Sequence, residues 1–256
     1  MKKYCFTVDD NIKFFAQIAK EGCDSIFGHP YLAMYKRLHE RFGVKVQLNL
    51  FYEMDGFTLA VFPDRYKEEW RANSHWLKLS FHSRIENVRP YENSGYDEVY
   101  GDCSAVHREI IRFASEEALA KTTTVHYCLT TPEGHQALKD CGVKGLLGLY
   151  GTDETPKSSY SIPSEKCEAI RAGENLHYRG ITHAAIDLIL NLYPKEQIIE
   201  RLEGCSDHEH LHVMIHEQYF YPDYPAYQPD FEEKLTAAFT LLEENGFRSD
   251  FFENMI

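Results

Sequence analysis

Short apolar runs alternate with longer amphipathic stretches along the whole chain. The apolar runs are rich in β-branched and aromatic residues, which is typical of buried strands. They predict strands at residues 3–9, 44–52, 76–82, 124–129, 143–150 and 210–219. The amphipathic stretches repeat apolar residues at helical spacing. They predict helices at residues 12–21, 31–42, 105–121, 132–141, 181–192 and 230–245.

Two of these helices carry clear terminal signals. Thr131 and Pro132 precede one of them, and Gly142 follows it. Proline favours the first turn of a helix, and glycine favours the position just after its end. The last helix places Phe231, Leu235, Phe239 and Leu242 on one stripe. These patterns predict helices that each cover a core with one face.

Alternating strands and helices predict an α/β fold with a parallel sheet inside and helices outside. No strand is followed by a glycine-rich nucleotide-binding motif, which disfavours an open dinucleotide-binding sheet. A (β/α) barrel is therefore the favoured architecture. The length of 256 residues suits a single barrel domain spanning residues 1–256. Irregular segments at 53–75, 83–104 and 152–180 follow strands, where loops often carry binding sites.

Composition narrows the class of partner. The chain has 27 Lys and Arg against 40 Asp and Glu, a formal charge of −13 that argues against nucleic acid. Seven scattered cysteines without a CxxC pair predict reduced thiols in a cytoplasmic protein. No apolar run is long enough for a signal peptide or a membrane span, so we expect neither. The oligomeric state stays open.

The first strand ends on two adjacent acids, Asp9 and Asp10. Neighbouring buried carboxylates repel each other unless something binds them. A bound divalent metal would relieve this repulsion, with one acid as its ligand and the other free as a base. The alternative is that one of them caps the helix that begins near Asn11.

Two other strands end on histidine. The strand at 76–82 ends at His82-Ser83, and the last strand ends at His216-Glu217. In a barrel, the carboxyl ends of the strands converge on one rim. Carboxylate and imidazole are the usual ligand set for Zn²⁺. The isolated histidines His126 and His135 give no such signal.

These motifs resemble the polysaccharide deacetylase family, carbohydrate esterase family four. Thr7-Val8-Asp9-Asp10 is similar to its opening T-F-D-D, His82-Ser83 to the first half of its H-[ST]-x-x-H, and residues 211–216 to its last motif. The resemblance implies a distorted, seven-stranded (β/α) barrel. It also implies that Asp9 is the catalytic base, Asp10 a metal ligand and His216 the general acid, with a divalent ion, expected to be zinc.

The chain departs from the family pattern at several places. Glu86 replaces the second histidine of the second motif, and Asn11 replaces the usual glycine. The family's arginine motif is absent, and Arg89 lies instead in the loop after His82. The third metal ligand is then His107, Glu86 or a water. We predict His107, because two imidazoles and one carboxylate leave the ion a stronger Lewis acid.

The predicted function is a metal-dependent hydrolase, a deacetylase of an N- or O-acetylated carbohydrate or related small molecule. Its partner would be a small-molecule or glycan substrate. The aromatic run at 219–227 would either stack on sugar rings or pack on the barrel mouth. The alternative is a non-catalytic sugar-binding barrel whose metal site has decayed.

Overall fold

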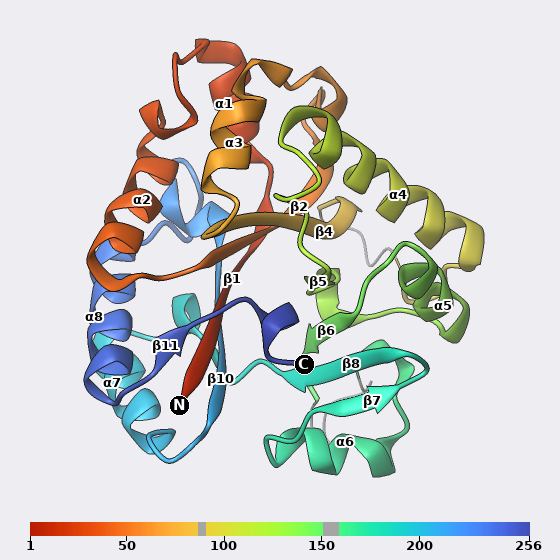
Figure 1. Cartoon of the computed structure of the whole chain (residues 1–256), viewed down its shortest axis with the longest axis vertical. Helices are drawn as coiled ribbons and strands as arrows, with labels where there is room; N and C mark the ends of the chain where they lie inside the picture. The colour runs from red at the N-terminus through yellow and green to blue at the C-terminus, as the bar shows by residue number, and fades with distance from the viewer. Residues whose placement is uncertain (87–90, 151–158) are drawn as a thin grey trace.

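The computed structural model describes residues 1–86, 91–150 and 159–256. These residues form two sheets with helices around their outside (Figure 1). Arg89, which the sequence placed in a loop near the site, lies outside the described residues.

The larger sheet carries the first and last long strands side by side. Its central strands are parallel, in the order β3-β2-β1-β10-β9, with β4 on β2 and β11 on β1. Only β3 runs antiparallel, as a short hairpin with β2. The strands are β1 (Lys3–Asn11), β2 (Val46–Met54), β3 (Phe57–Thr58), β4 (Leu77–Ile85), β9 (Leu188–Ile189), β10 (His210–His216) and β11 (Arg248–Ser249). Because β1 pairs with β10 in register, Asp9 lies opposite His216 at one end of the sheet.

The smaller sheet has the order β5-β6-β8-β7. Its strands are β5 (Thr122–Thr123), β6 (Gly145–Gly148), β7 (Leu176–Tyr178) and β8 (Ile181–Ala185). Backbone hydrogen bonds link the larger sheet to the segments that flank the smaller one. Leu79 donates to Ala118 and accepts from Ala120, just before β5, and Asp187, just after β8, donates to His212. The predicted α/β architecture is thus confirmed. The ladders of the described residues do not form one continuous seven-stranded barrel.

The helices lie outside the sheets, and α4 is the longest. They are α1 (Lys13–Glu21), α2 (Pro30–Phe42), α3 (Lys67–Asn73), α4 (Tyr96–Phe113), α5 (Pro132–Asp140), α6 (Ser164–Arg171), α7 (Lys195–Gly204) and α8 (Phe231–Glu244). Helix α5 begins as predicted, with the Thr131 side chain accepting from Gly134 N–H. The predicted stripe of α8 is buried along its length. Periodicity and caps therefore located these helices within a residue or two.

Two predicted elements are wrong in kind, and a third is displaced, since the helix predicted at residues 105–121 is α4 at Tyr96–Phe113. Residues 181–192 were predicted as a helix but form β8, β9 and a short 3-10 turn. Residues 124–129 were predicted as a strand, whereas β5 ends at Thr123 and a 3-10 turn follows at His126–Cys128. A short apolar run suits a helix or a buried strand equally well, so pairing with neighbouring strands decides between them.

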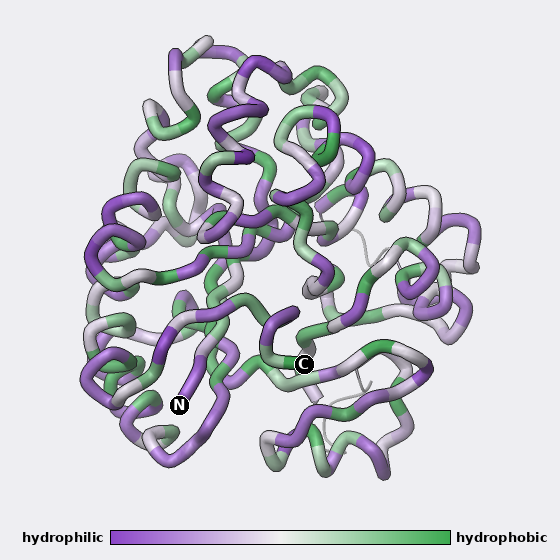
Figure 2. The backbone as a smooth tube through the Cα atoms, in the orientation of Figure 1, coloured by the Kyte–Doolittle hydropathy of each residue, from purple (hydrophilic) through white to green (hydrophobic). Residues whose placement is uncertain are grey.

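The core fills the space between the sheets and the helices. Large aromatic side chains such as Phe15, Trp70 and Tyr31 are fully buried in it. Figure 2 shows hydrophobic stretches along the central strands and frequent hydrophilic residues along the outer helices. Among the described residues, no helix has both the length and the apolar character needed to cross a lipid bilayer.

Candidate metal centre and active site

A bulge at the end of β1 points both adjacent acids into one cavity. Side chains alternate between the two faces of a regular strand, so Asp9 and Asp10 would normally diverge. Here the pairing of β1 with β2 shifts register between Val8 and Asn11. Asp10 takes the left-handed conformation, with φ of 64°. An extra residue in this conformation re-aims the side chains of a strand, and both acids line the cavity.

Asn11 holds this bulge in place. Its side-chain amide donates to the carbonyl oxygens of Val8 at 2.6 Å and Asn49 at 3.2 Å. Its amide oxygen accepts from the Tyr31 hydroxyl at 2.7 Å. All three contacts are buried, so Asn11 has a structural role.

The acids do not cap the helix that follows them. The carboxylate of Glu217 instead accepts the backbone N–H groups of Ile12, Lys13 and Phe14, at 2.7 to 3.0 Å. This contact binds the start of α1 to the end of β10. The helix-cap explanation of Asp9 and Asp10 is therefore excluded, and both carboxylates are available for chemistry.

Asp9 is buried, with only 2% of its surface exposed. Its Oδ1 accepts from the Asn49 side chain at 2.6 Å, and Gln47 in turn donates to Asn49 at 2.8 Å. Burial raises the pKa of Asp9, although the positive potential of His82 and His216 opposes this effect. A fixed carboxylate with a raised pKa is suited to accept a proton.

His82 lies at the end of β4 with its ring held by the backbone. Its Nδ1 donates to the carbonyl oxygen of Thr124, which leaves the lone pair on Nε2. That lone pair faces Asp10 Oδ1 at 3.0 Å. A ring oriented in this way is typical of a metal-binding histidine, whose second nitrogen is held by a carbonyl or carboxylate.

The third member of the group is His126, which the sequence did not indicate. It stands in the turn after β5, where Tyr127 and Cys128 both adopt positive φ. Its Nδ1 lies 3.3 Å from Asp10 Oδ1 and 3.1 Å from His82 Nε2. The predicted strand over 124–129 hid this residue, because His126 would then have been in mid-strand instead of just past its carboxyl end.

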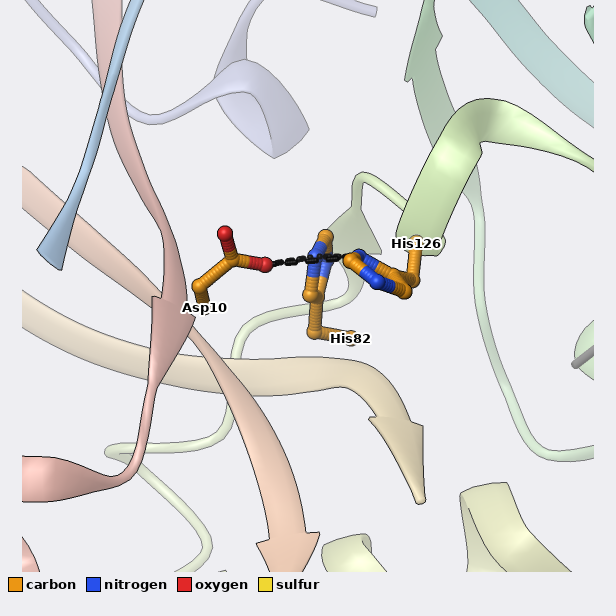
Figure 3. A group of neighbouring side chains, drawn as sticks. All are labelled: Asp10, His82 and His126. Carbon is orange, nitrogen blue, oxygen red and sulfur yellow. Dashed lines mark hydrogen bonds and ion pairs between the residues drawn. The ribbon is translucent and has the colours of Figure 1, made fainter. Parts of the chain in front are cut away.

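Figure 3 shows Asp10, His82 and His126 directed toward one point. Ligand atoms about 2.1 Å from an ion lie about 3.0 Å apart in octahedral and about 3.4 Å apart in tetrahedral geometry. The three observed separations, 3.0, 3.1 and 3.3 Å, fall in this interval. A carboxylate oxygen and two ring nitrogens are also ligand types that Zn²⁺ and similar ions bind. The three side chains therefore fit a divalent ion.

The charges of the group are strongly coupled. Burial alone would raise the pKa of Asp10, but hydrogen bonds with His126 and His82 hold it well below its usual range. Burial alone would lower the pKa of His82, but Asp9 and Asp10 raise it. The pKa of His126 is lowered, mainly by burial. The site thus keeps Asp10 ionised and attracts a positive charge beside it.

His216 and Gln218 border the same cavity from the end of β10. His216 Nδ1 donates to Asn191 Oδ1 at 2.9 Å, which leaves Nε2 as the other reactive nitrogen. Gln218 donates to Asp10 Oδ2 at 2.7 Å. The cavity has a volume of about 470 Å³ and includes the aromatic side chains of Tyr127, Tyr219 and Tyr224.

The structure does not bring His107 to this group. The sequence placed it near the start of a helix, but α4 begins at Tyr96, so His107 lies far along that helix. Its Nε2 lies 3.7 Å from Cys103 Sγ, and burial lowers its pKa to about 4. Glu86 does line the cavity, but it is not part of the three-residue group.

Comparisons with known proteins give a likeness of fold without a likeness of sequence. The chain matches no protein-family profile and no curated protein sequence. Its fold is similar to that of a 4-alpha-glucanotransferase from Thermococcus litoralis, with a TM-score of 0.64 and 14% identity over 99% of this chain. The chain spans 40% of the length of that protein.

Two family-four carbohydrate esterases have the same fold. An acetyl xylan esterase from Clostridium thermocellum, solved with a cobalt ion, has a TM-score of 0.55 and 13% identity over 99% of this chain and 90% of its own. A family-four pseudoenzyme from Bacillus anthracis has a TM-score of 0.53 and 10% identity, over 99% of this chain and 64% of its own. The chain thus has the fold of the family-four carbohydrate esterases, which confirms the resemblance read from the sequence at the level of fold.

Proposed function

We propose that this chain is a divalent-metal-dependent hydrolase that removes an acetyl group from an N- or O-acetylated carbohydrate or related small molecule. The observation that carries the proposal is the convergence of Asp10, His82 and His126 at ligand separations, beside a buried Asp9 and a free His216 nitrogen. Metal ligands and two proton-transfer groups in one cavity are what a metal hydrolase needs.

In this proposal the ligands are Asp10, His82 and His126, and His126 takes the place that the sequence gave to His107. Two imidazoles and one carboxylate favour zinc or a similar ion. A bound ion would supply Lewis acidity to the acyl oxygen and to water. Three protein ligands leave an open position for the substrate, as catalytic sites require.

The proton transfers are assigned to Asp9 and His216. Asp9 accepts the proton of the attacking water, and Asn49 keeps its carboxylate oriented. His216 delivers a proton from Nε2 to the leaving amine or alcohol, while its Nδ1 stays bonded to Asn191. The two groups lie opposite each other in the β1–β10 pairing, so they can act on the same substrate.

A second candidate function is a non-catalytic sugar-binding protein. Asn191 favours it, because a neutral amide stabilises a protonated His216 less than a carboxylate would. One protein of similar fold is itself described as a pseudoenzyme. Retention of a metal without turnover would support this alternative.

The deciding experiment measures metal content and acetate release on the same purified protein. We expect one divalent ion per chain, and acetate release from acetylated sugars that stops on chelation and returns with Zn²⁺ or Co²⁺. His107→Ala is the matched control, since it removes a histidine from another part of the molecule. Absence of a bound ion would contradict the metal assignment, and a bound ion without acetate release would favour the binding protein.

The predicted cytoplasmic location also stays a proposal. All seven cysteines have free thiols, which suits a reducing compartment. Location of the tagged chain in cell fractions would test it.

A further inference from the structure

Two cysteines from neighbouring helices meet outside the candidate active site. Cys103 lies within α4, and Cys141 is the residue that ends α5. The two helices pack against each other (Figure 1). A side-chain hydrogen bond joins the two thiols. Neither residue lines the active-site cavity, and the proposed hydrolysis does not use them.

Two further contacts fix the position of Cys141 on α4. Its Sγ lies 3.7 Å from the carbonyl oxygen of Tyr100 and 3.4 Å from the hydroxyl oxygen of Ser104. Residues three and four positions apart share one face of a helix, so Tyr100, Cys103 and Ser104 lie together on α4. Cys141 therefore rests on the face of α4 that carries Cys103.

The two thiols differ in exposure and in acidity. Cys141 is half-buried and lines a surface hollow of about 410 Å³, so small molecules in solvent can approach it. The hydrogen bond from Cys103 is the main cause that lowers the pKa of Cys141 to about 7, although burial and Asp140 oppose it. Cys103 is fully buried, and burial raises its pKa. Cys141 is therefore the thiolate that can react, and Cys103 is a protonated thiol held beside it.

We propose that Cys141 and Cys103 are a redox-sensitive thiol pair, which a hydroperoxide oxidises to a disulfide between α4 and α5. In the first step the Cys141 thiolate attacks a peroxide oxygen, the O–O bond breaks, and the leaving oxygen takes up a proton. Cys103 then attacks the sulfenic acid formed on Cys141. The S–O bond breaks, the S–S bond forms, and the proton of Cys103 leaves with the hydroxide as water. The two thiols lose two electrons, and the peroxide gains them.

The neighbours of the other half-exposed cysteines make this pair distinct. Among the described residues, neither Cys23 nor Cys205 has a recorded contact with another thiol. A sulfenic acid at either position would therefore lack a second cysteine that could close a disulfide. At Cys141 the second thiol is already in hydrogen-bond contact, so a disulfide can form there and a thiol reductant can reverse it by exchange. This inference is independent of the proposed hydrolase function.

The test starts from the fully reduced wild-type chain and needs no variant. Hydrogen peroxide is added, the remaining thiols are blocked with N-ethylmaleimide in denaturant, and the peptides are mapped without reduction. We expect two of the seven thiols to escape the label and one cross-linked peptide pair that contains Cys103 and Cys141. Dithiothreitol should restore both thiols. Seven labelled thiols after peroxide treatment, or cross-linking of a different pair, would overturn the inference.

Three variants separate the roles of the two thiols. Cys103→Ser keeps a hydrogen-bond donor for Cys141 but cannot form the disulfide, so Cys141 should stop at the sulfenic acid, which dimedone captures. Cys141→Ala should lose both the cross-link and the dimedone adduct. Cys205→Ala is the matched control, because it removes a half-exposed cysteine elsewhere and should keep the cross-link. Dimedone labelling of Cys103→Ser at a cysteine other than Cys141 would contradict the assignment.

Discussion

His126 offers the sharpest test of the metal centre, because the structure and the sequence disagree about it. The perturbation is His126→Ala, compared with His107→Ala. The first removes the ring nitrogen that lies 3.1 Å from His82 and 3.3 Å from Asp10. The second removes a ring that contacts Cys103 on the same helix and the backbone of Cys141. Only the first should change metal affinity.

The expected loss of metal affinity in His126→Ala follows from the number of ligands. Binding of zinc by four protein ligands contributes about 10–16 kcal/mol, or about 2.5–4 kcal/mol for each ligand. Loss of one of the three proposed ligands should therefore lower the affinity for the ion by about two to three orders of magnitude, since 1.4 kcal/mol is a factor of ten. His107→Ala should leave the affinity within about twofold of the wild type.

Competition with a chromophoric chelator measures this affinity directly. Thermal unfolding gives an independent check, because an ion at 100 times its dissociation constant stabilises the folded state by about 2.7 kcal/mol. The wild type and His107→Ala should gain that stability on addition of the ion, and His126→Ala should gain almost none at the same concentration. A loss below about 10-fold in His126→Ala, or an equal loss in His107→Ala, would refute the assignment.

Three further predictions address catalysis, the link between β10 and α1, and acid stability. Asp9→Asn and His216→Ala should each lower the rate of acetate release by about 10²–10⁴-fold with little change in metal affinity. Glu217→Ala should lower the free energy of unfolding by about 3–5 kcal/mol in urea, because it leaves three N–H groups of α1 without their acceptor. Asp250→Asn should destabilise the protein by about 1–2 kcal/mol at pH 7, since Asp250 accepts from two lysines. This difference should begin to shrink as the pH falls below about 4.

The pH dependence of the last variant follows from the direction of the shift. Hydrogen bonds from lysine and asparagine outweigh burial and hold the pKa of Asp250 well below its usual range in the folded protein. The contribution of Asp250 to the free energy of unfolding is complete above its unfolded-state pKa near 4. It is lost as the pH falls toward the pKa of Asp250 in the folded protein. A difference between Asp250→Asn and the wild type that stays constant from pH 7 to pH 3 would contradict this account.

Controls exist for the other two predictions. Glu217→Gln keeps one acceptor oxygen, so it should recover part of the stability that Glu217→Ala loses; equal losses in the two variants would argue against the hydrogen-bond explanation. For catalysis, a His216→Ala variant with wild-type turnover would remove His216 from the mechanism. A fall in metal affinity in Asp9→Asn that equals the fall in rate would show that Asp9 acts on the ion instead of on a proton.

The sequence alone determined the elements whose signals are local. Helix periodicity and terminal residues located α5 and α8, and the apolar run before Asp9 located β1. The same local reasoning drew attention to Asp10 and His82, because polar residues at the ends of parallel strands gather on one edge. These features depend only on neighbours in the chain, so they are readable without the fold.

The tertiary structure decided everything that depends on contacts between distant segments. Residues 181–192 became strands because β6 and β10 supplied hydrogen-bonding partners for them. His126 joined the proposed metal centre because a turn with two left-handed residues ended the strand early, a conformation that no periodicity reveals. The supporting roles of Asn49 on Asp9, and of Gln218 on Asp10, arise from pairs 40 and 208 residues apart. Sequence patterns report local preference, whereas the geometry of a site is set by packing across the whole molecule.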